Sequence, residues 1–556
     1  MSSVQEALAE LRQALGEEWA DHDPVILQGY FRDISTIDGV RPQIVALPST
    51  TAEVQAVVRI AGKHQLPLVP LSTGFNIAGL TLPREGGILL DLKRMDQVLK
   101  VDTETMTVTF QPYVRNAALQ AEVNRFSPAE GLRLRIANPI TVGSASYFGN
   151  IMSGGLSVNA VSTGVYHEYI GGQVWVLPDG EVLKIRSATH PSAPPLGNFK
   201  GPGPDISGMF YNAEGMMGVC TEMTVSLFID YPHRKMVIFR AQDMLQDETE
   251  PIIDFVYAIA RENLADEIYK SSNLTLSALM GPIVEEVALA FPENLVLVTL
   301  TGSTAEEVRI KEKQLMELVK KRPFVIIEHQ IMDLFYDIVG LWGDDFANLV
   351  FRKCYTLGGI MRWRGCFYFL GCATTMDRIP DLTEQFNLLI QKHFQPLNPP
   401  NNLRTKFRAL SILLNRSADQ VQKKTGEKRW RVMARRLLGL ARAPSFARLF
   451  FSKKMWARPL YPAHTAIQGP FPLGRGCWFE LDMWYNRGDP EDRERIRRFE
   501  TDCADMMIER DLFIPRDFAN AFSRQFPRLG IYRELVIKLK KEMDPDGIMN
   551  TKVLGF

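Results

Sequence analysis

Cysteine is scarce in this chain of 556 residues, and neither cysteine nor histidine has the spacing of a metal site. The six cysteines include no Cys-x-x-Cys pair, and the eight histidines include no His-Glu-x-x-His motif. We therefore expect reduced, mostly buried thiols in a cytoplasmic protein, and no metal centre.

Long apolar runs are also missing. No stretch of about 18 apolar residues occurs, so the sequence predicts no membrane-spanning helix. The N-terminal segment is acidic and lacks the basic and apolar regions of a signal peptide. Leu8, Leu11 and Leu15 have helical spacing, and we expect a helix there.

Neither sign of charge is in excess, because 64 Lys and Arg balance 64 Asp and Glu. The composition, 46% hydrophobic and 23% charged, is that of a globular protein of two to four domains. A zero balance argues against a general nucleic-acid binder. No Gly-x-Gly-x-x-Gly stands between a strand and a helix, and no Walker motif occurs, which disfavours the Rossmann and P-loop nucleotide sites.

Three loops rich in small residues follow predicted strands or precede one. They are Ser72–Gly79, Gly143–Gly155 and Asn212–Val219. Before the first loop, Pro48–Glu53 is a helix-capping signal and is followed by an apolar stripe at Val54, Val57, Val58 and Ala61. Backbone N–H groups in such loops can converge on an anion, although each loop taken alone has the composition of an ordinary tight turn.

The order and spacing of these segments resemble those of a known family. Pro48–Val58, Pro67–Asn76, Gly143–Gly155, Val176–Glu181 and Gly203–Glu222, with Tyr532–Asn550 near the C-terminus, resemble the FAD-binding domain of the vanillyl-alcohol oxidase and p-cresol dehydrogenase superfamily. The resemblance implies an α+β fold, in which a two-subdomain FAD-binding domain of the PCMH type carries an α+β cap over the flavin. The implied segments are an N-terminal part of the FAD domain at 1–232, a cap or substrate domain at 233–511, and a C-terminal return to the FAD domain at 512–556.

The resemblance also implies which residues hold FAD. The first loop, which cradles the pyrophosphate in the family, corresponds to Pro70, Ser72, Thr73, Gly74, Phe75, Asn76 and Ile77. The second loop corresponds to Pro139, Gly143, Ser144, Ser146, Asn150 and Gly154, and Gly218 and Val219 lie in the third. Many members attach the flavin through a histidine in the first loop, where this chain has none. Phe367 stands at the cap histidine's place, so non-covalent FAD is expected, with a tyrosyl linkage through Tyr368 as the alternative.

The family's phenol-binding residues are mostly replaced. Asn116 and Pro515 stand where the phenol oxidisers have tyrosines, and only Arg516 matches. We expect Arg516 to stabilise the anionic reduced flavin, the alternative being a surface arginine paired with Asp517. His167 is a candidate base or flavin contact, or else a structural histidine.

Weaker catalytic candidates are Asn116 and Tyr485, and we expect Phe367, Trp478 and Phe479 to form an apolar substrate pocket. A hydrophobic substrate follows from these replacements.

A basic insertion lies within 420–460. Between Lys428 and Arg458 there are ten basic residues and no acidic one, interleaved with large apolar side chains such as Trp430 and Trp456. This pattern favours an interfacial helix on an anionic membrane. A helical pair docked on an acidic protein or another subunit is the alternative, and nucleic acid is least favoured.

The sequence therefore predicts an FAD-dependent dehydrogenase or oxidase that moves hydride from a hydrophobic alcohol, alkyl-aromatic or lipid-like substrate to flavin N5. Oxygen or a redox protein would accept the electrons. The alternatives are a non-redox flavoenzyme of the alkylglycerone-phosphate synthase type and a catalytically decayed membrane-associated binding protein. We expect a cytoplasmic location, peripheral on the inner face of the membrane, and a homodimer.

Overall fold

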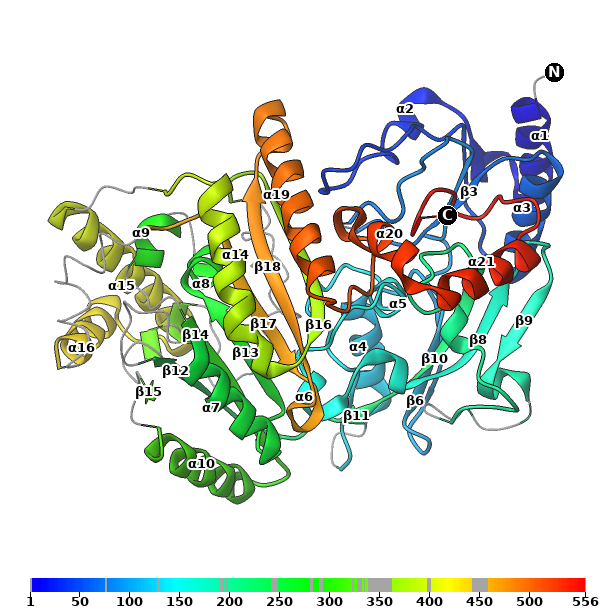
Figure 1. Cartoon of the computed structure of the whole chain (residues 1–556). Helices are drawn as coiled ribbons and strands as arrows, with labels where there is room; N and C mark the ends of the chain where they lie inside the picture. The colour runs from blue at the N-terminus through cyan, green and yellow to red at the C-terminus, as the bar shows by residue number, and fades with distance from the viewer. Residues whose placement is uncertain are drawn as a thin grey trace. The chain divides into compact units, whose positions relative to one another are not determined.

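The computed structural model divides into two compact units (Figure 1). Unit 1 comprises Met1–Ser157, Val165–Asp230 and Ala504–Phe556, and unit 2 comprises Val158–Gly164 and Tyr231–Cys503. The structure describes residues 3–75, 78–127, 131–190, 192, 195, 199–241, 249–280, 284–289, 294–322, 325–327, 333–334, 336–338, 363–397, 402–442 and 459–555.

Unit 1 begins with a small sheet of the order β1-β2-β4-β3, where β1 is Ala20–Asp21, β2 Ile44–Ala46, β3 Leu68–Leu71 and β4 Ile88–Asp91. Strands β2 and β3 run parallel to β4. Helices α1 (Ser3–Leu15) and α3 (Thr51–Lys63) bury their apolar stripes in the same core. Both predicted helices are confirmed, and Thr50 caps α3 by accepting a hydrogen bond from the Glu53 N–H at 3.2 Å.

A second sheet of unit 1 is antiparallel, with the order β5-β6-β10-β8-β9. Its strands are β5 Val98–Asp102, β6 Thr107–Phe110, β8 Ile170–Val176, β9 Val182–Ile185 and β10 Val219–Ser226. A hairpin turning at Asp179-Gly180 joins β8 to β9, and Gly180 has the positive φ (82°) that its turn requires. Short strands β7 (Leu134–Arg135) and β11 (Phe228–Ile229) pair separately.

The chain's C-terminal segment returns to unit 1. After the helices α20 (Ala521–Gln525) and α21 (Ile531–Met543), Met549 lies parallel to Leu68 at the free edge of β3. The Leu68 N–H donates to the Ile548 carbonyl at 2.7 Å, and the Asn550 N–H donates to the Leu68 carbonyl at 2.8 Å. Residues about 480 positions apart in sequence therefore share one sheet edge.

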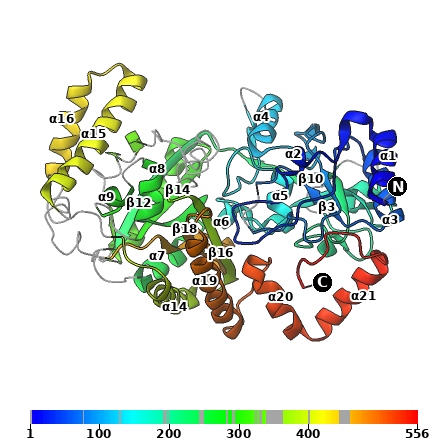
Figure 2. The ribbon, with the colours of Figure 1, turned by 90° about the horizontal axis from the view of Figure 1, so that it is seen from above.

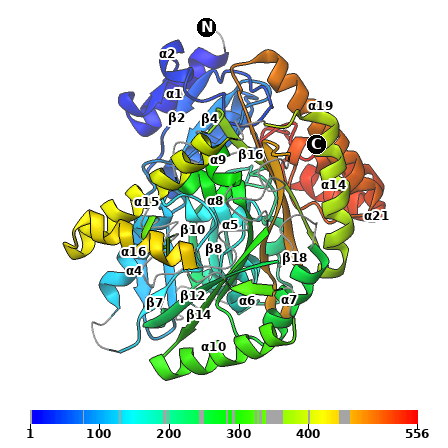
Figure 3. The ribbon, with the colours of Figure 1, turned by 90° about the vertical axis from the view of Figure 1, so that its left-hand side faces the viewer.

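Unit 2 is built on a seven-stranded antiparallel sheet of order β15-β12-β14-β13-β17-β18-β16. The strands are β12 His233–Ala241, β13 Glu267–Ser272, β14 Asn294–Gly302, β15 Val325–Ile327, β16 Cys366–Thr374, β17 Ala463–Pro470 and β18 Cys477–Tyr485. Helices α7 (Thr249–Arg261) and α14 (Ile379–His393) cover one face, and α8 (Asn273–Met280) lies on the other (Figure 3). The α+β fold is confirmed.

A helical hairpin also belongs to unit 2. It consists of α15 (Leu403–Thr425) and α16 (Arg429–Arg442), which lie side by side (Figure 2). Gly426 ends α15 in the left-handed conformation with φ 74°, which allows the chain to reverse direction within a few residues. The N-terminal half of the predicted basic insertion is therefore helical, whereas residues 443–458 lie outside the described part.

Candidate functional site

The first small-residue loop follows β3 directly and contacts the second loop. The Thr73 hydroxyl oxygen accepts a hydrogen bond from the Ser146 N–H at 2.9 Å. A Cβ on Gly149 would lie 3.0 Å from the Ser72 hydroxyl oxygen. Gly74 has a φ of 67°, and Phe75 is exposed. Asn76 and Ile77 lie outside the described residues.

The second loop leads into the short helix α5 (Tyr147–Met152), which Ser146 caps by accepting from the Gly149 N–H at 2.9 Å. The Asn150 amide donates to the Tyr166 hydroxyl at 3.1 Å. After the helix, Gly154 has a φ of 65°, and a Cβ there would lie 2.6 Å from the Asn212 side-chain oxygen. Both the conformation and the approach of the third loop therefore favour glycine at 154.

The third loop is held by the C-terminal segment. The Asn550 amide donates to the Glu214 carbonyl, and the Lys540 ammonium donates to the Met216 carbonyl at 2.7 Å. A Cβ on Gly215 would lie 2.6 Å from Pro70, at the end of β3. All three small-residue loops, which the sequence places up to about 140 residues apart, thus converge around the end of β3.

Arg516 lies beside these loops and is nearly buried, with 8% of its surface exposed. Its Nη2 donates to the Gly154 carbonyl at 2.7 Å, and its guanidinium carbon lies 4.9 Å from the centroid of the Phe518 ring. The alternative of a surface arginine is therefore wrong, since the side chain reaches inward to the second loop.

Glu214 is a group of this site that sequence reasoning missed. Burial raises the pKa of Glu214 to about 8, while the charge of Arg516 acts in the opposite direction and Asp517 adds to the rise. Its Oε1 is buried and makes no hydrogen bond within the described part of the chain. The sequence signal that could have identified Glu214 is an acidic residue within a loop of small residues. At neutral pH Glu214 is mostly protonated, so it does not cancel the charge of Arg516.

His167 packs against a second residue that the sequence did not single out, Tyr211. The two ring centroids are 5.5 Å apart, and burial lowers the pKa of His167. Burial also raises the pKa of Tyr211 to about 12. Both residues belong to unit 1. His167 is exposed and, with its lowered pKa, neutral at pH 7, the state in which an imidazole can accept a proton.

The other predicted residues of unit 1 support the loops from behind. Asn116 is fully buried, and its amide donates to the Val142 carbonyl at 3.1 Å, below the second loop. The Gly143 carbonyl accepts from the Ala117 N–H at 2.9 Å. Pro139 pairs with Ser157, and Ser144 is exposed. Gly218 and Val219 lie at the start of β10, where Val219 is opposite Val176.

The residues predicted to form the substrate pocket belong to unit 2, on β16 and β18. Because side chains alternate along a strand, Trp478 and Phe479 point to opposite faces of the sheet and cannot line one pocket. Phe479 packs on Phe386 of α14 with ring centroids 5.5 Å apart, and Tyr485 shares its face. Phe367 is opposite Trp484 and lies on the same face as Trp478. The prediction that Phe479 joins Trp478 in one pocket was wrong for this reason.

The face that carries Trp478 also carries an acid–base group. His464 Nε2 lies 2.9 Å from the Thr275 hydroxyl and 3.7 Å from Asp482 Oδ2. Burial lowers the pKa of His464 to about 3 and raises the pKa of Asp482 to about 6. The Trp478 Nε1 donates to Glu480 at 2.9 Å. No spacing in the sequence links these strands, so only their pairing brings the groups together.

The arrangement in unit 1 fits a dinucleotide cofactor. Small residues at Ser72 and Gly74 leave little side-chain bulk on the first loop, and Arg516 supplies a positive charge beside the second loop. The buried Asn116 Oδ1 and Glu214 Oε1 have no hydrogen-bond partner among the described residues, which leaves polar capacity for a ligand. Among the same residues, no group of three or more potential metal ligands occurs, and no helix is long and apolar enough to cross a membrane.

Comparison with known proteins agrees with this fit. Residues 42–186 match the FAD binding domain family. The glycolate oxidase subunit GlcD of Bacillus subtilis is 27% identical over 217 residues, which are 39% of this chain and 43% of the GlcD chain. The 1'-carboxy-chondrochloren decarboxylase of Chondromyces crocatus is 29% identical over 264 residues, covering 47% of each chain. The chain thus spans about half the length of the curated relatives it matches.

Solved structures resemble the chain over its whole length. Substrate-bound p-cresol methylhydroxylase has a TM-score of 0.75 at 17% identity, and the superposition covers 100% of this chain and 97% of the p-cresol methylhydroxylase chain. An alkyldihydroxyacetonephosphate synthase has a TM-score of 0.65 at 14% identity, covering 98% and 85%. These likenesses concern the fold. They show that the chain has the fold of p-cresol methylhydroxylase, and the match over residues 42–186 shows an FAD-binding domain.

Proposed function

We propose that this flavoprotein is an oxidoreductase, a dehydrogenase or an oxidase, that removes hydride from a hydrophobic alcohol, alkyl-aromatic or lipid-like substrate. The observation that carries the proposal is the buried Arg516 beside three converging loops, with Glu214 protonated next to it. Bound FAD would supply a two-electron acceptor that becomes negatively charged on reduction. Arg516 would stabilise that charge, because Glu214 does not neutralise it at pH 7.

A hydrophobic rather than phenolic or small polar substrate is proposed because the family's phenol-binding tyrosines are replaced here. The places of the phenol-binding tyrosines hold Asn116 and Pro515, and Asn116 already donates to the Val142 carbonyl. On unit 2, Phe367, Trp478 and Trp484 share one sheet face. The same face carries Asp482, whose pKa burial raises to about 6.

The reaction is tested by adding substrates anaerobically and following the flavin absorbance. Loss of the oxidised flavin bands with long-chain alcohols or alkyl-aromatics supports the proposal, and lack of bleaching across this panel, with glycolate and D-lactate as polar comparisons, contradicts it. Arg516→Gln should slow flavin reduction about 100-fold, whereas Arg516→Lys should retain part of the rate.

Non-covalent FAD is proposed because no histidine stands beside Phe75 in the described part of the first loop. Tyr368, the alternative attachment point, is fully buried on the helix-covered side of β16, opposite Met483. Acid precipitation should therefore release the flavin into the supernatant, and yellow protein pellets would contradict this.

A second candidate is a non-redox flavoenzyme, favoured by the structural likeness to alkyldihydroxyacetonephosphate synthase. The same anaerobic titration separates the candidates, since a covalent adduct has an absorbance distinct from that of reduced flavin. Absence of any spectral change would favour a binding protein whose catalytic residues have decayed. For the oxidoreductase, rapid reoxidation in air would assign oxygen as acceptor, and slow reoxidation a redox protein. We also propose a cytoplasmic protein that is peripheral on the membrane and homodimeric, the latter testable by light scattering.

A further inference from the structure

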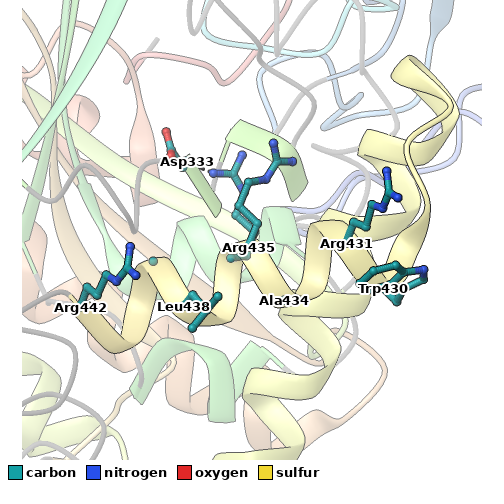
Figure 4. Close-up of a pocket in the computed structure, with 9 residues that line it drawn as sticks. Asp333, Trp430, Arg431, Ala434, Arg435, Leu438 and Arg442 are labelled. Atoms are coloured by element: carbon teal, nitrogen blue, oxygen red, sulfur yellow. Dashed lines mark hydrogen bonds and ion pairs between the residues drawn. The ribbon is translucent and has the colours of Figure 1, made fainter.

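The outward face of α16 carries three arginines and one leucine in one line. Arg431, Arg435, Leu438 and Arg442 follow the spacing i, i+4, i+7 and i+11, and at 100° per residue they fall within about 60° of one another. All four are exposed. They line a surface cavity of about 510 Å³ with Trp430 and Asp333 (Figure 4).

The opposite face of α16 is fixed to unit 2. Val432 and Leu440 are buried, and Val432 packs with Ala418 and Val421 of α15. The Arg436 guanidinium donates to Asp337 at 2.6 Å and to Asp333 at 2.8 Å, and the Ser417 hydroxyl also donates to Asp337 at 2.6 Å. Because this inner face is occupied, the helix presents the same outer face to its surroundings.

Part of the positive charge on this hairpin is balanced internally. Arg429 pairs with Asp419 at 3.0 Å, and Arg435 pairs with Glu427 at 2.9 Å. Lys428, Arg431 and Arg442 form no ion pair within the described residues. The segment 428–458 contains no acidic residue, yet three arginines of α16 have acidic partners from outside the segment, and three cations of the described part of the hairpin remain for a ligand.

Large apolar side chains stand beside these cations. Trp430 is 63% exposed, Leu437 46% and Leu438 57%. Trp430 and Leu437 are seven residues apart and lie on one side of the helix, about 100° to 120° round its axis from Arg431 at 100° per residue. The Arg431 guanidinium carbon lies 5.4 Å from the centroid of the Trp430 ring. Exposed apolar groups next to uncompensated cations are the two features by which a helix binds an anionic lipid surface.

We propose that the outer face of α16 docks on the anionic phospholipid surface of a bilayer, with Arg431 and Arg442 on lipid phosphates and Trp430, Leu437 and Leu438 among the upper acyl carbons. The charge of the face and its exposed apolar groups are complementary to such a surface. This inference rests on the peripheral location proposed above and is independent of the redox reaction.

The test uses flavin-bound protein and flotation with vesicles of phosphatidylcholine, alone or with 30% phosphatidylserine. Wild type should float with the anionic vesicles only, and added salt should weaken the binding. Arg431→Ser/Arg442→Ser should weaken it about 25-fold, since each cation near such a surface contributes roughly fivefold. Trp430→Ser/Leu437→Ser should also weaken it, with less dependence on salt.

The matched control is Lys313→Ser/Lys321→Ser, which removes the same charge from exposed positions on and just after α10 (Ala305–Lys320). The control should float like wild type. Equal flotation of the Arg431→Ser/Arg442→Ser variant would overturn the assignment to α16, as would equal binding to neutral vesicles. Failure of wild type to float, with a molecular mass that falls in the arginine variant, would assign the face to a second copy instead. The FAD content and substrate reduction of each variant are measured separately, so failure of the redox proposal is distinguishable.

Discussion

Glu214→Gln offers a direct test of the electrostatics at the flavin loops. Burial raises the pKa of this carboxyl from 4.5 to about 8. Between these values the unfolded chain has released its proton while the folded protein retains it, so stability falls as pH rises from about 4.5 to 8. pH 7 is about 2.5 units above the pKa of 4.5 in the unfolded chain, so at pH 7 the buried carboxyl lowers the free energy of unfolding by about 3 kcal/mol. At pH 5 it lowers that free energy by about 1 kcal/mol or less.

Glutamine has nearly the same shape as the protonated carboxyl but does not titrate. We expect Glu214→Gln to match wild type within about 1 kcal/mol at pH 5 and to exceed it by about 3 kcal/mol at pH 7. Urea unfolding of the flavin-bound protein, followed by flavin fluorescence, measures both. The control is Glu104→Gln, an exposed carboxyl of unit 1, which should show no such pH dependence. An equal effect of Glu214→Gln at both pH values, or a loss of stability at pH 8, would refute the reasoning.

Three further variants test the packing around the site and the hairpin. Gly154→Ala should lose most bound FAD, because the Cβ of the alanine would collide with Asn212. Its control is Gly203→Ala, a position with a similar φ (69°) but open space around it, which should keep its FAD. The FAD content of both variants is measured by an absorbance titration. Asn550→Ala should lower the unfolding free energy by about 1–3 kcal/mol, since its buried amide ties the C-terminal segment to the third loop. Asp337→Ala should cost about 3–5 kcal/mol in urea unfolding, because it leaves Arg436 without its buried partner; a loss under 1 kcal/mol would mean that Asp333 suffices.

The sequence by itself determined the local elements and the class of the protein. The stripe of Val54, Val57, Val58 and Ala61 and the cap at Thr50 specify α3 without reference to the rest of the chain, because hydrophobic period and capping are local properties. The loop segments in their order were enough to resemble one flavoprotein family, and the fold and matched domain agree with that resemblance.

Only the tertiary structure decided which groups meet. In the sequence Glu214 is one residue of a short loop. Its raised pKa comes from burial, and that burial depends on segments more than 300 positions apart in the chain. Strand alternation separated Phe479 from Trp478, and strand pairing brought His464 to Asp482. On α16, three of the five arginines are balanced by acids from other segments. Charge and composition are sums along the chain, whereas pKa, pairing and exposure depend on distances that only folding sets.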